Sequence, residues 1–399
     1  MEEFRQMIAN LYKIGPVFLL ILAMIDCSTE QNYIVITAHN SLHETRVNET
    51  IEIEWADIKS SFKCKSINSI RIIDLQTKKD VIYQMLDYEV DGTIDQLIFQ
   101  TDFAPNESKT FKLIRSNIKT ADELEQKVYG RFVPERKDDF AWENDHIAFR
   151  MYGPALGATG DVNSGIDVWV KSVRSPIIDK WYGNGEDSYH KDHGEGLDFY
   201  KVGNSRGCGG LGIWEDGELF TSRTFKSWKI VAAGPIRFIF ELTYSPWEVK
   251  NGKVSEVKRI SLDTGHNLNR FESQFKLNYD QSELVYAVGL AKHEKQGTGE
   301  IRFHEQIGVL SFWEPSTKGN GNLGTGIIFD PANFVKTVNT DDHHFALAKT
   351  GTGMKATYYA GAGWDKSGDF PDAESWLKYL TQYAMYLASP VEISISGKR

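Results

Sequence analysis

Short β-prone runs separated by turn residues recur along almost the whole chain. Examples are YIVITA at residues 33–38, TIEIEW at residues 50–55 and GIDVWV at residues 165–170. Many runs alternate apolar and polar residues, which is typical of an antiparallel sheet with one solvated face. Only residues 374–385 have apolar side chains at a convincing helical spacing. We therefore predict an all-β fold with few helices, built from stacked antiparallel sheets.

The strand-like runs divide into two parts. Residues 29–115 contain a first set, with an Asp-Gly turn at residues 91–92, and predict a small N-terminal β-sandwich. Residues 116–399 predict a large antiparallel β-sandwich, with a short helical stretch at residues 121–127 as the joining segment. A last strand is expected at residues 391–396, inside this second unit.

Residues 1–28 have the pattern of an export signal. Arg5 and Lys13 precede the uncharged apolar run 14–25, which is too short to cross a bilayer and suits a signal peptide. Cys27 directly after the run indicates a lipoprotein signal as the alternative, although Asp26 is unfavourable just before a lipidated cysteine. We expect an exported protein, either periplasmic or a membrane-anchored lipoprotein.

Charge and cysteine content restrict the partners. A net charge of −10 argues against nucleic acid. An acidic substrate would need basic residues that overcome this negative field locally. Cys64 and Cys208 are the cysteines left after processing, so no disulfide framework is predicted, and a single bridge between them is the alternative.

Residues 131–150 form the first dense polar segment. Arg136 and Lys137 are cations that bind carboxylates, and the amide of Asn144 binds hydroxyl groups. Trp142 offers a flat aromatic face of the kind on which sugar rings pack. The segment is interpreted as substrate-binding, with an ordinary solvated loop as the alternative.

Residues 181–214 form the second polar segment, and it is rich in glycine. Glycines allow the backbone to approach a ligand closely, and long glycine-rich loops often carry function. The segment does not match a dinucleotide-binding fingerprint. A possible divalent metal is expected at His190, His193 and Asp198, because imidazoles and a carboxylate are common ligands. The candidate catalytic residues of the segment are Tyr189, His190, His193 and Arg206.

Two further residues lie at strand ends. Lys292 ends the run 284–292, and we expect its side chain to point into a ligand cleft. Trp364 follows a strand and is flanked by glycine-rich sequence. It is interpreted either as an exposed platform for a sugar ring or as a buried corner residue.

Four phrases carry a resemblance to a known family: RFVPERKDDFAWENDHIAFRMYGPAL, SGIDVWVKS, YHKDHGEGLDFYKVGNSRGCGGLGIW and YYAGAGWDKSGDF. Together they resemble exported bacterial proteins from polysaccharide-utilisation loci, long catalogued as a domain of unknown function. The resemblance spans nearly the whole mature chain. It implies a galactose-mutarotase-like β-super-sandwich. It also implies similarity to an oligosaccharide dehydratase that acts on ulvan, a sulfated rhamnose- and uronate-containing polysaccharide.

Such a dehydratase removes water from the uronic acid at the non-reducing end and leaves a 4,5-unsaturated uronate. The reaction needs a base, an acid for the leaving hydroxyl and a group that offsets the carboxylate charge. We predict His190 and His193 as the base and acid, and Arg206, with Arg136 as second choice, at the carboxylate. Tyr189, Lys137 and Lys292 are the alternatives for these catalytic roles, and Trp142 and Asn144 are expected to bind the sugar. Trp142, His190, His193 and Arg206 are expected to line one concavity of the larger sandwich.

Two other functions are consistent with the sequence. A polysaccharide lyase or an epimerase of the mutarotase-like fold would use the same proton abstraction with another leaving group or none. A non-catalytic carbohydrate-binding surface protein would need the aromatic residues and glycines but not the histidines. In each case the partner is a uronate-containing oligosaccharide, with a lipid anchor at Cys27 if the lipoprotein signal is used.

Overall fold

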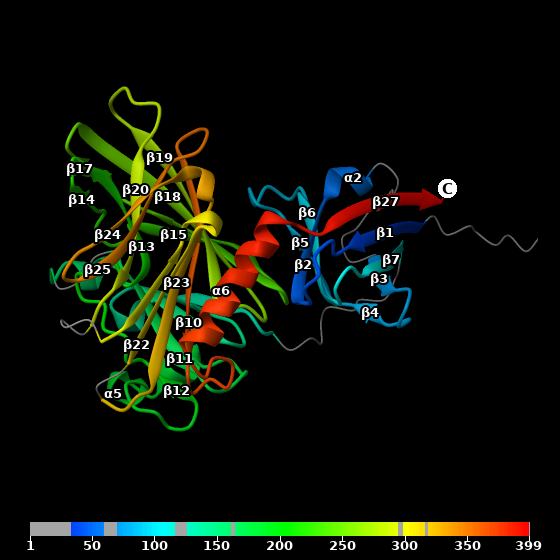
Figure 1. Ribbon diagram of the computed structural model, residues 1–399, viewed down its shortest axis with the longest axis horizontal. Coiled ribbons are helices and arrows are strands. Elements are labelled where there is room, and N and C mark those ends of the chain that lie inside the picture. Colours follow the sequence, from blue (N-terminus) through cyan, green and yellow to red (C-terminus); the bar gives the residue numbers. More distant parts are fainter. Residues whose placement is uncertain are drawn as a thin grey trace, which may run out of the picture.

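The computed structural model describes residues 33–59, 70–115, 126–160, 164–293, 298–315 and 318–398. Strands dominate these segments and helices are few, which confirms the predicted all-β class. Figure 1 shows a smaller unit that carries β1 and the C-terminus, beside a larger unit that carries most of the sheets. No helix in the described segments is long and apolar enough to cross a membrane.

The small unit packs two antiparallel sheets face to face. One has the strand order β27–β1–β7–β3–β4 and the other β2–β6–β5. Alternate residues of β1, namely Ile34, Ile36 and Ala38, point into the core between them. The strands are β1 (Tyr33–His39), β2 (Arg46–Glu54), β3 (Ile70–Asp74), β4 (Asp80–Val81), β5 (Tyr83–Leu86), β6 (Gln96–Phe103), β7 (Ser108–Arg115) and β27 (Glu392–Lys398). A short helix, α2 (Trp55–Lys59), follows β2.

The last strand completes the small unit rather than the large one. β27 pairs antiparallel with β1, so that Ile395 lies opposite Ile36. The buried guanidinium of Arg46 donates to the carbonyl oxygen of Ser389, just before β27. The division expected at residue 116 had placed this strand in the large unit. The structure differs because β1 would otherwise present an unpaired edge to solvent.

The large unit contains three antiparallel sheets around a shared core. The first has the order β12–β11–β10–β9–β8 and the second β14–β13–β20–β25–β24. Their strands are β8 (Tyr129–Val133), β9 (Asp139–Glu143), β10 (Ile147–Met151), β11 (Ile166–Lys171), β12 (Gly196–Leu197), β13 (Cys208–Glu215), β14 (Glu218–Phe220), β20 (Val285–Ala291), β24 (Phe334–Asn339) and β25 (His343–Lys349). Phe149, Val168, Leu211 and Val288 bring these two sheets into one hydrophobic cluster.

The third sheet is the largest and has nine strands. Its order is β15–β16–β18–β19–β26–β23–β22–β21, with β17 paired to β18. These strands are β15 (Ser227–Ala233), β16 (Arg237–Thr243), β17 (Trp247–Val249), β18 (Gly252–Asp263), β19 (Leu268–Leu277), β21 (Glu300–His304), β22 (Val309–Pro315), β23 (Asn322–Phe329) and β26 (Lys355–Trp364). Phe240, Phe271 and Tyr358 join it to the shared core.

The predicted C-terminal helix is α6 (Ala373–Ala388). Its N-terminus is fixed by a capping box, in which the Asp372 side chain accepts from the backbone of Ser375. Trp376, Leu380 and Ala384 form its buried face. Figure 1 shows α6 lying along β22 and β23 of the large unit and leading into β27 of the small one.

Several expectations fall on other parts of the chain. Residues 1–28 lie outside the described segments, so export and lipidation stay predictions. The helical stretch expected at residues 121–127 is described only at Gln126 and Lys127, which are not helical. Cys64 also lies outside, whereas Cys208 is a buried free thiol that donates to the carbonyl oxygen of Gly361 at 3.1 Å.

The alternation along β1 can be tested with two substitutions. Ile36→Ala should lower the free energy of unfolding of the small unit by about 2–4 kcal/mol, because it empties a fully buried position. Val35→Ala, on the opposite and partly exposed face of the same strand, should change it by less than about 1 kcal/mol. Urea unfolding measures both. Equal effects would contradict the assigned register.

Candidate functional site

A buried group of charged side chains lies in the β8–β12 sheet. The guanidinium of Arg150, on β10, is 2.5 Å from Asp167 on β11 and 3.1 Å from Asp198, which follows β12. Asp139, on β9, is 3.8 Å away. None of the four is more than 4% exposed. We call these four residues the Arg150 cluster.

Strand register builds the Arg150 cluster. Arg150 lies directly opposite Asp167 in the antiparallel pair β10–β11, so the two side chains share a face of the sheet. The sequence signal for this pair is a charged residue at a buried position of an otherwise apolar strand. It occurs in both HIAFRMY and GIDVWV, but the prediction did not use it.

Burial changes the protonation of the carboxyl groups in the Arg150 cluster. Desolvation raises the pKa of Asp139 to about 7. Desolvation, reinforced by the neighbouring Asp167, raises the pKa of Asp198 well above its ordinary value. Asp167 makes the two shorter contacts with Arg150 and is therefore the carboxylate that pairs with it. Desolvation also raises the pKa of Asp167, so near pH 7 the cluster carries less negative charge than its three carboxyl groups could hold.

Tyr189 connects the Arg150 cluster to the surface. Its phenol oxygen accepts hydrogen bonds from Arg136 at 3.2 Å and from Arg150 at 3.5 Å. Its ring stacks on Trp169 with centroids 4.8 Å apart, which fixes its orientation. Two guanidinium donors on one oxygen favour negative charge there. Tyr189 is therefore suited to exchange a proton with a ligand.

Arg136 is positioned by a tight turn before β9. It ends the short 3₁₀ helix η2 (Pro134–Arg136) and is half-buried. The next residue, Lys137, is exposed and has a left-handed backbone with φ of 52°. Gly153 packs against this turn, and a Cβ there would lie 1.7 Å from the carbonyl oxygen of Asp138. The turn therefore requires glycine at position 153 in order to hold Arg136 at the rim of the cluster.

His190 follows the short helix α5 (Glu186–Tyr189) and is held in one orientation. Its Nδ1 lies 2.9 Å from the backbone carbonyl oxygen of Asp198 and 3.7 Å from the carboxyl group of that residue. A carbonyl oxygen only accepts, so Nδ1 carries the hydrogen and Nε2 presents a lone pair. The side chain is 45% exposed. His190 is thus an oriented base at the edge of the Arg150 cluster.

A cavity of about 330 Å³ opens beside these residues. This volume lies in the usual range for small-molecule sites. Tyr189 contributes to both the cavity wall and the Arg150 cluster. Lys180, in α4 (Ile178–Gly183), is paired with Glu195 at 2.6 Å. The other wall residues include Trp181, Lys191 and His193.

The structure therefore brings together part of the predicted site. Tyr189, His190 and Asp198 meet at one point, and Arg136 from the first polar segment joins them. His193 lies on the wall of the adjoining cavity. Arg150, Asp139 and Asp167 complete the arrangement and were not predicted.

Arg206 is placed elsewhere, in the core of the large unit. It is 1% exposed, and its Nη1 donates to Ser164 at 3.1 Å and to the carbonyl oxygen of Leu211 at 3.3 Å. Burial lowers its pKa to about 10, with Tyr244 among the groups that oppose this shift. The prediction that Arg206 lines a concavity is corrected accordingly: its guanidinium is enclosed by protein.

The three predicted sugar-binding residues other than the cations are also buried. Trp142 is fully enclosed and donates to the Asn269 side chain at 2.7 Å. Asn144 donates to two backbone carbonyl oxygens, both at 2.6 Å. Trp364 is 2% exposed and donates to the carbonyl oxygen of Asn320 at 2.8 Å, as a buried corner residue would. In this structure none of them presents a face or an amide to a ligand.

Lys292 belongs to a different surface region. It follows β20, and its amino group donates to Asn339 at 2.5 Å and to the carbonyl oxygen of Thr340 at 2.6 Å. These contacts fasten it to the β24–β25 turn. The neighbouring His343 accepts a hydrogen bond from the backbone of Arg206 at 2.9 Å.

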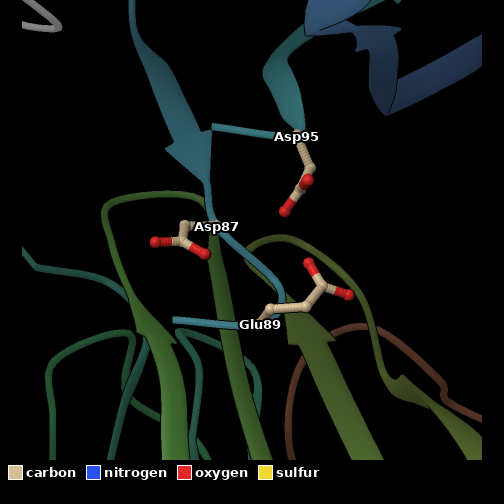
Figure 2. A group of neighbouring side chains, drawn as sticks. All are labelled: Asp87, Glu89 and Asp95. Atoms are coloured by element: carbon tan, nitrogen blue, oxygen red, sulfur yellow. The ribbon is translucent and has the colours of Figure 1, made fainter. Parts of the chain in front are cut away.

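His190 and Asp198 lie 3.7 Å apart, but the expected set of three metal ligands with His193 is not assembled within the described residues. Within the described residues, one group has three ligand atoms within 4.8 Å of one another, and it consists of Asp87, Glu89 and Asp95 of the small unit. Figure 2 shows these carboxylates clustered in a single loop region. Asp87 accepts from the backbone of Gly92 at 2.7 Å, and Asp95 from Tyr88 at 2.7 Å, so loop amides already use their oxygens.

The chain is similar to known proteins in its fold and in its sequence, and the similarities in fold are to two larger proteins. An alpha-mannosidase from Enterococcus faecalis has a TM-score of 0.51 at 11% identity, over 92% of this chain and 46% of that chain. A glycosyl hydrolase family 38 protein from the same organism has a TM-score of 0.50 at 11% identity, over 93% and 48%. This chain thus spans less than half the length of either. At such low identity the likeness concerns the fold.

A closer sequence relative is the "Uncharacterized protein P7" of Formosa agariphila. It is 36% identical over 376 residues, which cover 90% of this chain and 93% of the relative. The family described as "Domain of unknown function (DUF4861)" matches residues 38–393, which include both units and the Arg150 cluster. The chain belongs to this family.

Proposed function

We propose that the protein is a carbohydrate-active dehydratase that removes water from the terminal uronic acid of an oligosaccharide of the ulvan type. The observation that carries the proposal is His190, an oriented base beside Tyr189 and Arg136. The fold shared with proteins of glycoside-hydrolase type supports a carbohydrate substrate, as an analogy at fold level.

The reaction requires proton transfer at two adjacent carbons. His190 Nε2 takes the proton from C5, which bears the carboxylate, and the electron pair forms the C4–C5 double bond. The C4–O bond breaks, and the leaving hydroxyl takes a proton from Tyr189 and departs as water. Arg136 offsets the charge that develops on the carboxylate. His193 and Lys191, in the adjoining cavity, bind the next sugar unit.

The protonation of the Arg150 cluster reduces the repulsion between the acidic protein and a negatively charged substrate. A protein of net charge −10 repels a uronate. Burial raises the pKa of Asp139 to about 7 and that of Asp198 well above its ordinary value, which reduces the negative charge near Arg136 at and below neutral pH. The positive field of Arg136 and Arg150 then extends to the rim where the substrate carboxylate binds.

A product assay distinguishes the three function classes. With a uronate-ended oligosaccharide, a dehydratase gives a new ultraviolet absorbance and the loss of one water by mass spectrometry, without chain shortening. A lyase gives the absorbance together with shorter chains, and a binding protein gives neither.

His190→Gln removes the proposed base while preserving a side chain of similar size. We expect kcat/KM for dehydration to fall by about 10²–10⁴-fold, the usual contribution of a general base. His304→Gln, at an exposed position on β21, is the matched control and should keep full activity. Undiminished turnover in His190→Gln would refute the assignment of the base.

Arg136→Ala tests the carboxylate site. We expect kcat/KM to fall by about 10²-fold, the effect of losing one donor to developing charge, and guanidine in the buffer should restore part of it. Arg131→Ala is the control, because Arg131 pairs with Asp179 and Glu135, both at 2.6 Å. Arg206→Met should lower thermal stability instead, which reverses the order expected from the sequence. Equal activity of the Arg136 and Arg131 variants would exclude Arg136.

The raised pKa of Asp139 predicts a pH dependence. As pH rises through about 7, Asp139 ionises, the field at Arg136 weakens and KM for the uronate should rise. Because the folded-state pKa exceeds the ordinary 3.8, the folded state binds this proton more tightly, so wild-type stability falls between about pH 4 and 7 relative to Asp139→Asn.

Steady-state kinetics and urea unfolding of wild type and Asp139→Asn from pH 5 to 9 measure both effects. The variant should show a flatter KM profile and the larger unfolding free energy at high pH. Parallel pH profiles for the two proteins in both measurements would contradict the raised pKa.

A further inference from the structure

A second cavity lies where the two units meet. It has a volume of about 370 Å³, within the usual range for small-molecule sites. β2 and the start of β27 contribute wall residues from the small unit, and β16, β18, β19, β26 and α6 contribute them from the large unit. Figure 1 shows the C-terminal end of α6 at the place where the two units meet. We call this second cavity the junction cavity.

Arg270, on β19, gives the junction cavity an unsatisfied donor. Its Nη2 bonds Glu272 at 3.0 Å, but its Nε is buried and has no hydrogen-bond partner among the described residues. Lys355 also contacts Glu272, at 2.5 Å, so the carboxylate is shared. A buried donor left without an acceptor costs free energy, and a ligand oxygen would remove that cost if a small shift of the Arg270 side chain let it reach Nε.

Tyrosine side chains supply both faces and hydroxyl groups. The rings of Tyr359, on β26, and Tyr383, on α6, are tilted against each other with centroids 5.6 Å apart. Neither phenol hydroxyl makes a hydrogen bond within the described residues. The rings of Tyr383 and His266 also pack edge to face, with their centroids 5.5 Å apart. Such rings offer apolar surface to the C–H face of a sugar, while their hydroxyls bond its oxygens.

The charged groups that line the junction cavity are largely paired. Arg237 pairs with Glu52 at 2.7 Å and with Asp263 at 2.5 Å. One oxygen of Glu49 accepts from Arg46 at 2.8 Å, which leaves the other oxygen available to a ligand hydroxyl. Desolvation raises the pKa of Glu49, so an added negative charge beside it is disfavoured. The lining therefore suits an uncharged ligand with several hydroxyl groups.

We propose that the junction cavity is a second carbohydrate-binding site that takes a neutral pyranose. Arg270 donates to a ring or hydroxyl oxygen, and Glu49 accepts from a hydroxyl. Tyr359 and Tyr383 pack against the sugar and bond its oxygens through their hydroxyl groups. The site contacts both units, so a bound sugar also fixes their relative position. The inference stands on the cavity alone and is independent of the proposed dehydratase.

Two probes that differ only at C6 test the proposal: methyl β-D-glucopyranoside and methyl β-D-glucopyranosiduronate. Binding to the full chain is measured by ligand-observed NMR titration in the Arg136→Ala background, which removes the proposed carboxylate site. The glucoside should bind saturably, and more tightly than the uronate, because Glu49 and Glu52 repel the carboxylate.

Tyr383→Phe removes one hydroxyl and keeps the ring. It should weaken glucoside binding about fivefold, the effect of one hydrogen bond, and the double variant with Tyr359→Phe should weaken it further. Tyr279→Phe is the matched control, because its hydroxyl bonds Glu215 at 3.3 Å and it does not line the cavity. His190→Gln should bind the glucoside as wild type does.

Three results would overturn the proposal. They are no saturable binding of the glucoside, tighter binding of the uronate than of the glucoside, and equal affinities for the Tyr383 and Tyr279 variants. Loss of dehydratase activity in His190→Gln with unchanged glucoside binding would support both proposals separately. Absence of any dehydratase activity would leave the binding measurement valid.

Discussion

The geometry of the catalytic candidate depends on one buried cation. Placing Arg150 between β9 and β11 removes its guanidinium from water, which costs several kcal/mol unless carboxyl groups surround it. Asp167 supplies the main ion pair from the opposite strand, and Asp198 reaches in from the segment after β12. The same segment then presents the Asp198 carbonyl oxygen that orients His190. The imidazole of His190 is therefore positioned by the same segment that helps to neutralise Arg150.

The two polar segments divide their residues between the core and the candidate site. Trp142 and Asn144 connect the β8–β12 sheet to the nine-stranded sheet. Trp142 donates to the side chain of Asn269, and Asn144 donates to the carbonyl oxygens of Asp263 and His266. Arg136 and Tyr189, from the same segments, instead meet at the surface of the Arg150 cluster. A rigid core behind a polar rim is the arrangement that keeps catalytic groups within a fraction of an ångström of their working positions.

The C-terminal part of the chain connects the two units. Helix α6 packs on the large unit. The chain then continues into β27, which pairs with β1 and completes the sheet of the small unit. β27 thus pairs with a strand that lies far away in the sequence, and the small unit cannot form its complete sheet without residues 392–398. The junction cavity lies beside the segment that joins α6 to β27, and tyrosines of α6 and carboxylates of β2 line it. Sites between units are common in proteins that bind small molecules.

The sequence by itself determined the all-β class and the position of the C-terminal helix, because alternation and helical spacing are local properties. Tertiary structure decided the rest. The partner of β27 is a strand at the other end of the chain, and no local pattern identifies it. Whether Arg136 or Arg206 faces a ligand depends on which strands cover it, since either guanidinium can be stabilised in the core or at a rim. Arg150 and Asp167 were overlooked for the same reason: their significance arises only when strand pairing places opposite charges face to face in a region without water.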